Sequence, residues 1–243
     1  ALALGIAFAA LERAAGEPLL PRDLGGAGFR ATVALALIGQ ALSMAIGIHM
    51  PLYLEEVRGM TPAATGRWLA ILPLVALVLA PAAGRLSDRL GTRPFMTAGL
   101  ALTTIGMGAL AFLGVAPAGT RVAVALLLVG VGLGLFVVTN SSALLGHVPP
   151  SRLGAASGMQ ATMRNLGIAG GSAVTAAVLA SRFSAHGGST LGAGTLPAAE
   201  REAVALASRD LYLGLAALAA VAVVLAARFG TGARPADPAR SAA

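Results

Sequence analysis

The sequence predicts an integral membrane protein built of α-helices. Apolar residues make up 57% of the 243 residues and charged residues 11%, whereas an ordinary soluble domain has about 45–50% apolar and about 25% charged residues. The apolar residues gather in runs about as long as a helical membrane crossing, which needs roughly 20 residues. Aromatic residues are only 4%, so small and aliphatic side chains dominate, and these let helices approach closely in lipid.

Six apolar runs are long enough, or nearly so, to cross a bilayer as helices. A helix is the expected form because lipid offers no hydrogen-bond partners to an open backbone. An incomplete run at residues 1–11 predicts an additional, partial transmembrane helix. The six runs cover residues 31–54, 64–83, 95–116, 122–145, 156–180 and 211–227.

The breaks between the runs predict the domain organisation. Most breaks are short, so consecutive helices are expected to be antiparallel neighbours in one bundle. We expect a cytoplasmic linker at residues 12–30, a six-helix transmembrane domain at 31–228 and a disordered cytoplasmic tail at 229–243. The longest predicted loop, 181–210, contains a polar stretch at 197–209 that predicts a short surface helix.

Composition excludes several classes of function. The net charge is +7, but the basic residues are all Arg and lie singly among apolar runs, whereas a nucleic-acid site needs them clustered on one face. The chain contains no Cys and 3 His that lack the spacing of a metal pair. It also has no Lys for a phosphate-binding loop and no Ser flanked as a nucleophile elbow. The sequence therefore predicts no nucleic-acid partner, metal or cofactor, and no enzyme.

The arginines outside the runs predict the orientation. More of them fall on the side of residues 84–94 than on the opposite side, and cytoplasmic loops of membrane proteins are enriched in Arg. We therefore expect residues 84–94 and the C-terminus in the cytoplasm, in a multi-pass protein of the inner (plasma) membrane.

Residues 84–94, GRLSDRLGTRP, resemble a signature of the major facilitator superfamily, located between the second and third helix of a six-helix half. In this motif a small residue allows close packing, a carboxylate caps a helix or pairs with Arg, a glycine allows a tight reversal and two arginines hold the cytoplasmic side. These roles fall on Gly84, Asp88, Gly91, Arg89 and Arg93, respectively. The alternative is a generic polar hairpin between two spans.

Two further stretches are similar to fourteen-span drug:proton antiporters of that superfamily. One is Glu12 followed by EPLLP at 17–21, and the other is PPSRLGAASG at 149–158 followed by RNLG at 164–167. The resemblance implies that the chain is a cropped C-terminal six-helix half whose partner is a missing N-terminal half of the same transporter. It also implies proton-coupled efflux of amphipathic small molecules or drugs, cationic or neutral, across the bilayer. The alternatives are a carrier of a non-drug solute such as a sugar or metabolite and, more remotely, an integral membrane enzyme.

Polar residues in the spans expected to face the cavity are the candidate substrate contacts, because a polar group facing lipid is costly. In the fifth span Gln160, Arg164, Gly167, Gly171 and Thr175 share one helical stripe. Arg164 is expected either to bind an anionic group or a carboxylate of the missing half, or to extend toward the headgroups. Gly167, Gly170 and Gly171 are expected to serve helix packing.

The first and fourth spans supply the other candidates. Gln40 and Ser43 share one face of the first span, and His49 lies toward its outer end, as a protonatable gate or an interfacial hydrogen-bonding residue. Asn140 in the fourth span can donate and accept hydrogen bonds. None of the six runs contains Asp or Glu, so the proton-coupling carboxylate is expected in the missing half.

Overall fold

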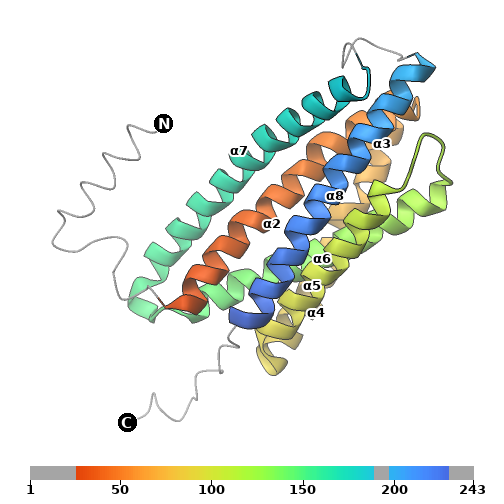
Figure 1. Ribbon diagram of the computed structural model, residues 1–243. Coiled ribbons are helices and arrows are strands. Elements are labelled where there is room, and N and C mark those ends of the chain that lie inside the picture. Colours follow the sequence, from red (N-terminus) through yellow and green to blue (C-terminus); the bar gives the residue numbers. More distant parts are fainter. Residues whose placement is uncertain (1–25, 189–196, 230–243) are drawn as a thin grey trace, which may run out of the picture.

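The computed structural model describes residues 26–188 and 197–229, and within them the chain is helical with short connections and no strand (Figure 1). The predicted partial helix at 1–11, the linker up to residue 25 and the tail from residue 230 lie outside the described residues. The elements are α2 (Ala27–Leu52), the π-helix η2 (Tyr53–Val57), α3 (Pro62–Leu69), α4 (Ile71–Leu90), α5 (Thr92–Ala111), α6 (Gly119–Gly146), the 3-10 helix η3 (Pro150–Arg152), α7 (Leu153–Ala185) and α8 (Ala198–Phe229).

Six helical segments of the described chain are long and apolar enough to cross a membrane, which confirms the predicted number of full spans. Their bounds are Ala27–Val57, Pro62–Leu90, Thr92–Ala111, Gly119–Gly146, Pro150–Ala185 and Glu200–Phe229. The second span consists of α3 and α4, which meet at Ala70. Pro73 lies just after this junction, and because it has no backbone N–H it cannot bond the carbonyl of Leu69.

The predicted loop at 181–210 is wrong in its second half. α8 is one continuous helix from Ala198 to Phe229, so the predicted surface helix and the sixth span are parts of the same element. The stretch is rich in Ala, Glu and Arg, which are good helix formers, and Pro197 directly precedes it. Charged side chains interrupt the apolar run there without interrupting the helix.

The predicted loop at 84–94 is also wrong, because it is almost entirely helical. α4 continues to Leu90 and α5 begins at Thr92, with Gly91 alone between them. Gly91 has φ 86° and ψ 159°, a region open essentially to glycine, so the expected tight reversal at this residue is confirmed.

The other signature residues lie around this reversal. Asp88 is exposed in the last turn of α4, and α5 has no side-chain cap, so the predicted capping role of Asp88 is wrong. No ion pair of Asp88 occurs within the described residues. Arg93 donates a hydrogen bond to the carbonyl of Ala227 and so joins the start of α5 to the end of α8.

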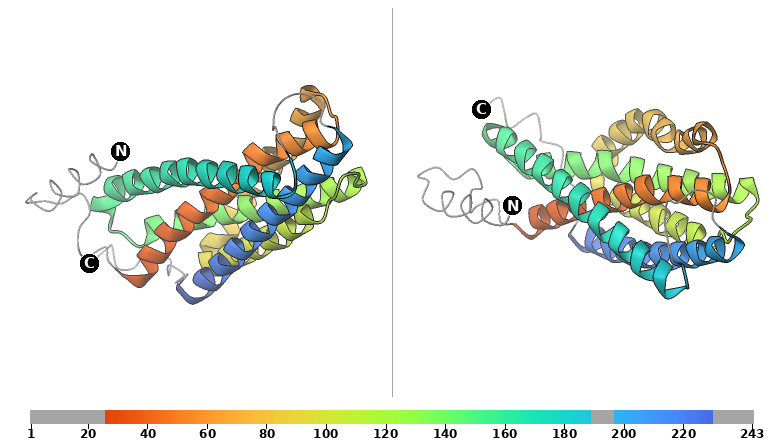
Figure 2. Two further views of the ribbon diagram at one scale, coloured as in Figure 1. Left: turned by 45° about the horizontal axis from the view of Figure 1, so that its top comes forward. Right: turned by 90° about the horizontal axis from the view of Figure 1, so that it is seen from above.

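The helices form a bundle in which α5 packs against α6 and α8, and α2 against α7 (Figures 1 and 2). The α3–α4 span lies at one edge, where α4 contacts α6 (Figure 2). Only 6% of the most apolar part of this span is buried. Leu77 and Val78 are 72% and 74% exposed, so this span is the least covered of the six.

Glycines set the closest helix approaches. A Cβ atom on Gly167 would lie 2.7 Å from the carbonyl oxygen of Leu37, and one on Gly171 would lie 2.6 Å from the Cα of Ala41. The packing interpretation of these two glycines is confirmed, because both press α7 against the backbone of α2. The same expectation is wrong for Gly170, because a Cβ there would meet nothing within 4 Å.

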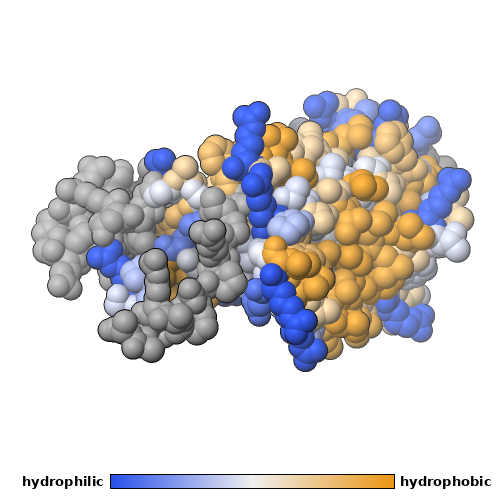
Figure 3. All heavy atoms as spheres, turned by 90° about the horizontal axis from the view of Figure 1, so that it is seen from below, coloured by the Kyte–Doolittle hydropathy of each residue, from blue (hydrophilic) through white to orange (hydrophobic). Residues whose placement is uncertain are grey.

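Buried aliphatic and aromatic side chains fill the bundle between α2, α5, α6 and α8, while much of the outside is apolar. Figure 3 shows a broad apolar surface with hydrophilic side chains toward its margins. Such a surface is unfavourable in water and normal in lipid, where close packing rather than the hydrophobic effect holds helices together.

Candidate substrate-binding site

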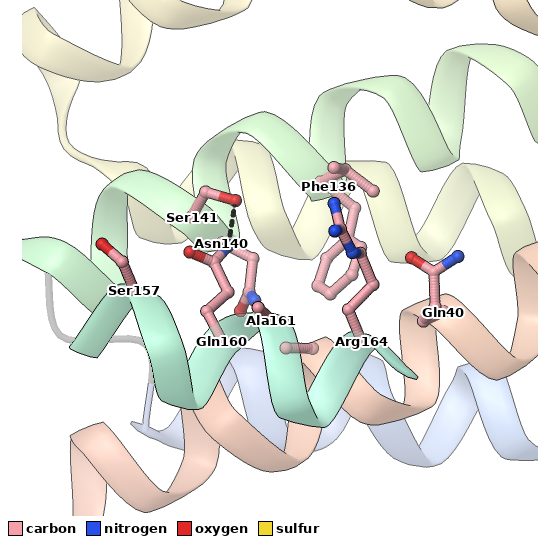
Figure 4. Close-up of a pocket in the computed structure, with 10 residues that line it drawn as sticks. Gln40, Phe136, Asn140, Ser141, Ser157, Gln160, Ala161 and Arg164 are labelled. Atoms are coloured by element: carbon pink, nitrogen blue, oxygen red, sulfur yellow. Dashed lines mark hydrogen bonds between the residues drawn. The ribbon is translucent and has the colours of Figure 1, made fainter. Parts of the chain in front are cut away.

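A pocket of about 230 Å³ lies between α2, α6 and α7, beside the N-terminal half of α7 (Figure 4). α6 and α7 have few direct contacts with each other, while each of them packs against α2. The space between α6 and α7 therefore remains open. Its lining residues are Ala36, Gln40, Phe136, Val137, Asn140, Ser141, Ser157, Gln160, Ala161 and Arg164.

Helical periodicity explains which side chains meet there. On α7, Ser157, Gln160 and Arg164 follow one another at three- and four-residue steps and so lie on one face. On α6, Phe136 and Asn140 lie one turn apart, as Ala36 and Gln40 do on α2. Three regular helices thus bring these separate stretches of sequence to one site.

The amides of the pocket differ in their hydrogen bonding. Gln160 Nε2 donates to Ser141 Oγ at 2.5 Å, which links α7 to α6 (Figure 4). Asn140 is 3% exposed, and its Oδ1 has no hydrogen-bond partner within the described part of the chain. A buried acceptor without a partner costs about 1–3 kcal/mol, so this oxygen is available to a donor that enters the pocket.

Arg164 is the only charged residue that lines the pocket. Within the described residues its guanidinium makes no hydrogen bond or ion pair. The residue lies about three turns after Leu153, or roughly 16 Å along α7. α7 has 33 residues and is about 50 Å long, so this position falls at membrane depth, where charged residues face cavities and mark functional sites.

A second, apolar groove of about 350 Å³ adjoins the pocket between α2, α4 and α6. Val137 lines both, and Ser43 is one of the few polar groups of the groove. Its lining residues are Ser43, Ile46, Leu72, Pro73, Ala76, Ala80, Gly130, Leu133, Gly134, Val137 and Val138. The bundle therefore presents a polar recess beside an apolar one.

The predicted candidates separate into three groups. The structure brings Gln40, Asn140, Gln160 and Arg164 together in the pocket and places Ser43 in the adjoining groove. His49 and Thr175 line neither; both are buried. His49 packs against α8 instead, with its ring nitrogens bonded to Tyr212 and Ser208.

Sequence reasoning missed Phe136, Ser141 and Ser157 as pocket residues. Two of them could have been found from helical spacing, since Phe136 precedes Asn140 by one turn and Ser157 precedes Gln160 by three residues. Ser141 is the residue after Asn140, so it lies off that stripe, and its bond to Gln160 is visible only in the structure.

Comparison with known proteins identifies the family. The family model of the Major Facilitator Superfamily matches residues 2–172, which is more than half of the chain. The chain belongs to the major facilitator superfamily. It is a multi-pass membrane protein of a transporter family, in agreement with the resemblance of residues 84–94.

Three curated proteins that resemble the chain are named as transporters or resistance proteins. The chain is 35% identical over 130 residues to the riboflavin transporter RibZ of Clostridioides difficile, covering 54% of this chain and 28% of that protein. It is 32% identical over 177 residues to the uncharacterized transporter YebQ of Escherichia coli, covering 72% and 39%. It is 34% identical over 185 residues to the multidrug resistance protein Stp of Mycobacterium tuberculosis, covering 73% and 33%.

The matched part of each relative is therefore well under half of that relative's length. Within the superfamily, substrate and coupling sites lie near the membrane midplane between structural repeats. The pocket between α2, α6 and α7 is the candidate for this chain's share of such a site.

Proposed function

We propose that this chain forms one wall of the transport cavity of a secondary active exporter, which moves amphipathic small molecules or drugs out of the cell in exchange for protons. One observation carries the proposal: a polar pocket, with a charge that none of the described residues pairs, opens at membrane depth beside an apolar groove. In a membrane-spanning bundle, such polar groups are retained where a solute or water reaches them. Similarity to a multidrug resistance protein supports drug export.

The opposite wall is proposed to come from an N-terminal half of the same transporter. The α3–α4 span and the pocket side of α7 are sparsely covered in this bundle, and alternating access requires two halves that move around a shared site. No Asp or Glu lines the pocket or the groove, which favours a coupling carboxylate on that second half. The proposed location is the plasma membrane, with residues 84–94 and the C-terminus in the cytoplasm.

A second candidate function is transport of a non-drug solute, favoured by the 35% identity to a riboflavin transporter. The two candidates differ in what the pocket accepts. A drug exporter takes varied amphipathic molecules, whereas a dedicated carrier takes one solute and its near relatives.

The test uses the full-length protein that contains this chain, reconstituted into liposomes with an imposed proton gradient. Rhodamine B and riboflavin are both fluorescent, so accumulation of each can be followed directly. The proposal predicts accumulation of rhodamine B that a protonophore abolishes. Gln160→Leu, which removes a pocket amide, should slow it, while Ser172→Ala on the same helix but outside the pocket should not.

Gradient-driven accumulation of riboflavin alone would favour the second candidate. Accumulation of neither compound, in vesicles where the protein is folded and correctly inserted, would contradict the proposed function. Equal rates for Gln160→Leu and the unmodified protein would contradict the placement of the site.

A further inference from the structure

We infer that the pocket selects substrates that carry a carboxylate, with Arg164 binding that group and Asn140 accepting a hydrogen bond from an N–H or O–H of the same molecule. The inference rests on the proposed function and names its substrate class. It differs from the expectation of a cationic or neutral substrate, because a cationic ring system would be accepted only on a molecule that also has an acidic group near Arg164.

The pocket carries one positive charge, that of Arg164. Arg164 is its only ionised residue, so the potential inside is positive. A guanidinium remains protonated at all physiological pH values, and Arg164 is exposed, so a molecule that enters the pocket can reach it. Because none of the described residues pairs with it, an entering anion gains an interaction that these residues leave open.

The side chain of Arg164 points into the pocket (Figure 4). Figure 4 shows the guanidinium of Arg164 reaching from α7 across toward α6, beside Phe136. A side chain that extended to the headgroups would run along α7 toward Leu153 instead. The observed direction places the planar donor groups in the pocket, where they match the two oxygens of a carboxylate.

Asn140 supplies a hydrogen-bond acceptor in the same pocket. Asn140 Oδ1 is buried, has no partner in the described part of the chain and lines the same pocket. Gln160, in contrast, already donates to Ser141. The pocket therefore offers one cationic donor group and one free acceptor, which together fit a carboxylate next to a hydrogen-bond donor.

The adjoining groove offers space for the rest of the substrate. It is lined almost wholly by aliphatic and small residues and meets the pocket at Val137. An apolar body of the substrate fits this groove while its acidic end lies at Arg164. The arrangement selects an amphipathic acid or zwitterion rather than a simple cation.

Two dyes that differ at one group provide the test. Rhodamine B has a free carboxylate, and its ethyl ester has the same ring system without that charge. Binding of each dye to the purified full-length protein is measured by fluorescence anisotropy, and gradient-driven accumulation is measured in liposomes. The variants are Arg164→Gln, Arg164→Lys and, as a control, Arg67→Gln, which removes an exposed arginine outside the pocket.

The unmodified protein should bind rhodamine B roughly tenfold or more tightly than the ester, as expected for hydrogen bonds to a charged group. Arg164→Gln should remove this preference by weakening binding of the acid alone, Arg164→Lys should retain part of it, and Arg67→Gln should keep it. Ester affinity that is unchanged in Arg164→Gln also shows that the variant is folded.

Equal binding of the two dyes by the unmodified protein would overturn the inference. So would an equal loss of both dyes in Arg164→Gln, which is the result expected if Arg164 instead pairs with a carboxylate of the other half. Gradient-driven accumulation of both dyes without preference would agree with the proposed function and contradict only the inference. Absence of any gradient-driven accumulation would contradict the proposed function itself.

Discussion

The imidazole of His49 on α2 and the hydroxyl of Tyr212 on α8 are hydrogen-bonded inside the bundle, with 3.0 Å between Nδ1 and Oη. His49 Nε2 lies 2.9 Å from Ser208 Oγ, whose own hydroxyl donates to the carbonyl of Val204 at 2.6 Å. The serine oxygen must then accept from Nε2–H. The Tyr212 hydroxyl bonds Nδ1 and also lies 3.5 Å from the sulfur of Met50. Both ring nitrogens are satisfied, and the imidazole joins α2 to α8 rather than contacting the pocket.

The first prediction is that His49 contributes to stability. His49→Ala removes a buried ring and leaves the hydroxyls of Tyr212 and Ser208 without one of their partners, so the free energy of unfolding should fall by about 2–4 kcal/mol. Tyr212→Phe keeps the ring and should cost only about 1 kcal/mol. Thermal unfolding of the full-length protein in detergent measures both. An unchanged melting temperature for His49→Ala would show that the connection between α2 and α8 is not stabilising.

The second prediction concerns the contact between α2 and α7. Gly171→Ala places a methyl group 2.6 Å from the Cα of Ala41, which forces the helices apart at a cost of about 1–3 kcal/mol. The matched control is Gly170→Ala, whose new methyl group meets nothing within 4 Å. The yield of monodisperse protein should fall for the first variant and hold for the second. Similar yields for the two variants would contradict the observed helix approach.

The third prediction concerns Asp88, whose carboxylate is exposed in the last turn of α4. A negative charge at that end of a helix opposes the helix dipole, by about 0.3–1 kcal/mol. Asp88→Asn should therefore leave the melting temperature unchanged or slightly raised. Gradient-driven transport should nevertheless fall, because we expect the carboxylate to stabilise one conformation of the complete transporter. Full transport by Asp88→Asn at equal expression would contradict a role of this carboxylate in stabilising one conformation.

The fourth prediction is the orientation. The chain contains no Cys, so single cysteines can be introduced and labelled with an impermeant reagent in intact cells. A cysteine at Leu90, exposed at the end of α4, should stay unlabelled, and one at Ser184, exposed near the end of α7, should react. Permeabilising the cells should then allow Leu90→Cys to react. Labelling of the cysteine at position 90 in intact cells would reverse the orientation.

Hydropathy and composition were sufficient to predict the six spans, because lipid imposes a minimum length on each helix. They failed at the helix ends. Charged residues in 197–209 and in 84–90 lowered the local hydropathy, yet both stretches continue helices. A helix that projects beyond the hydrocarbon keeps the same backbone hydrogen bonds as the part inside the membrane. The length of the apolar run therefore does not show where the helix ends.

Side-chain identity alone predicted part of the site. Gln40, Asn140, Gln160 and Arg164 meet in the pocket because polar groups of facing helices avoid lipid. His49 is equally polar, but Tyr212 and Ser208 satisfy it within the bundle. These partners are more than 150 residues away in sequence, and no local pattern indicates them. The distinction between a polar residue satisfied by the bundle and one left open to a solute required the tertiary structure.

The most direct test of the account asks whether substrate passes the pocket between α2, α6 and α7. In the full-length protein with no other cysteine, Gln160→Cys places a thiol in the pocket, and Val174→Cys places one on an exposed part of the same helix outside it. Both proteins are treated with a methanethiosulfonate reagent, and gradient-driven transport of rhodamine B is then measured. The account predicts that the reagent blocks transport by the first variant alone and that rhodamine B present during treatment prevents the block. Full transport after complete modification of Gln160→Cys would contradict the account.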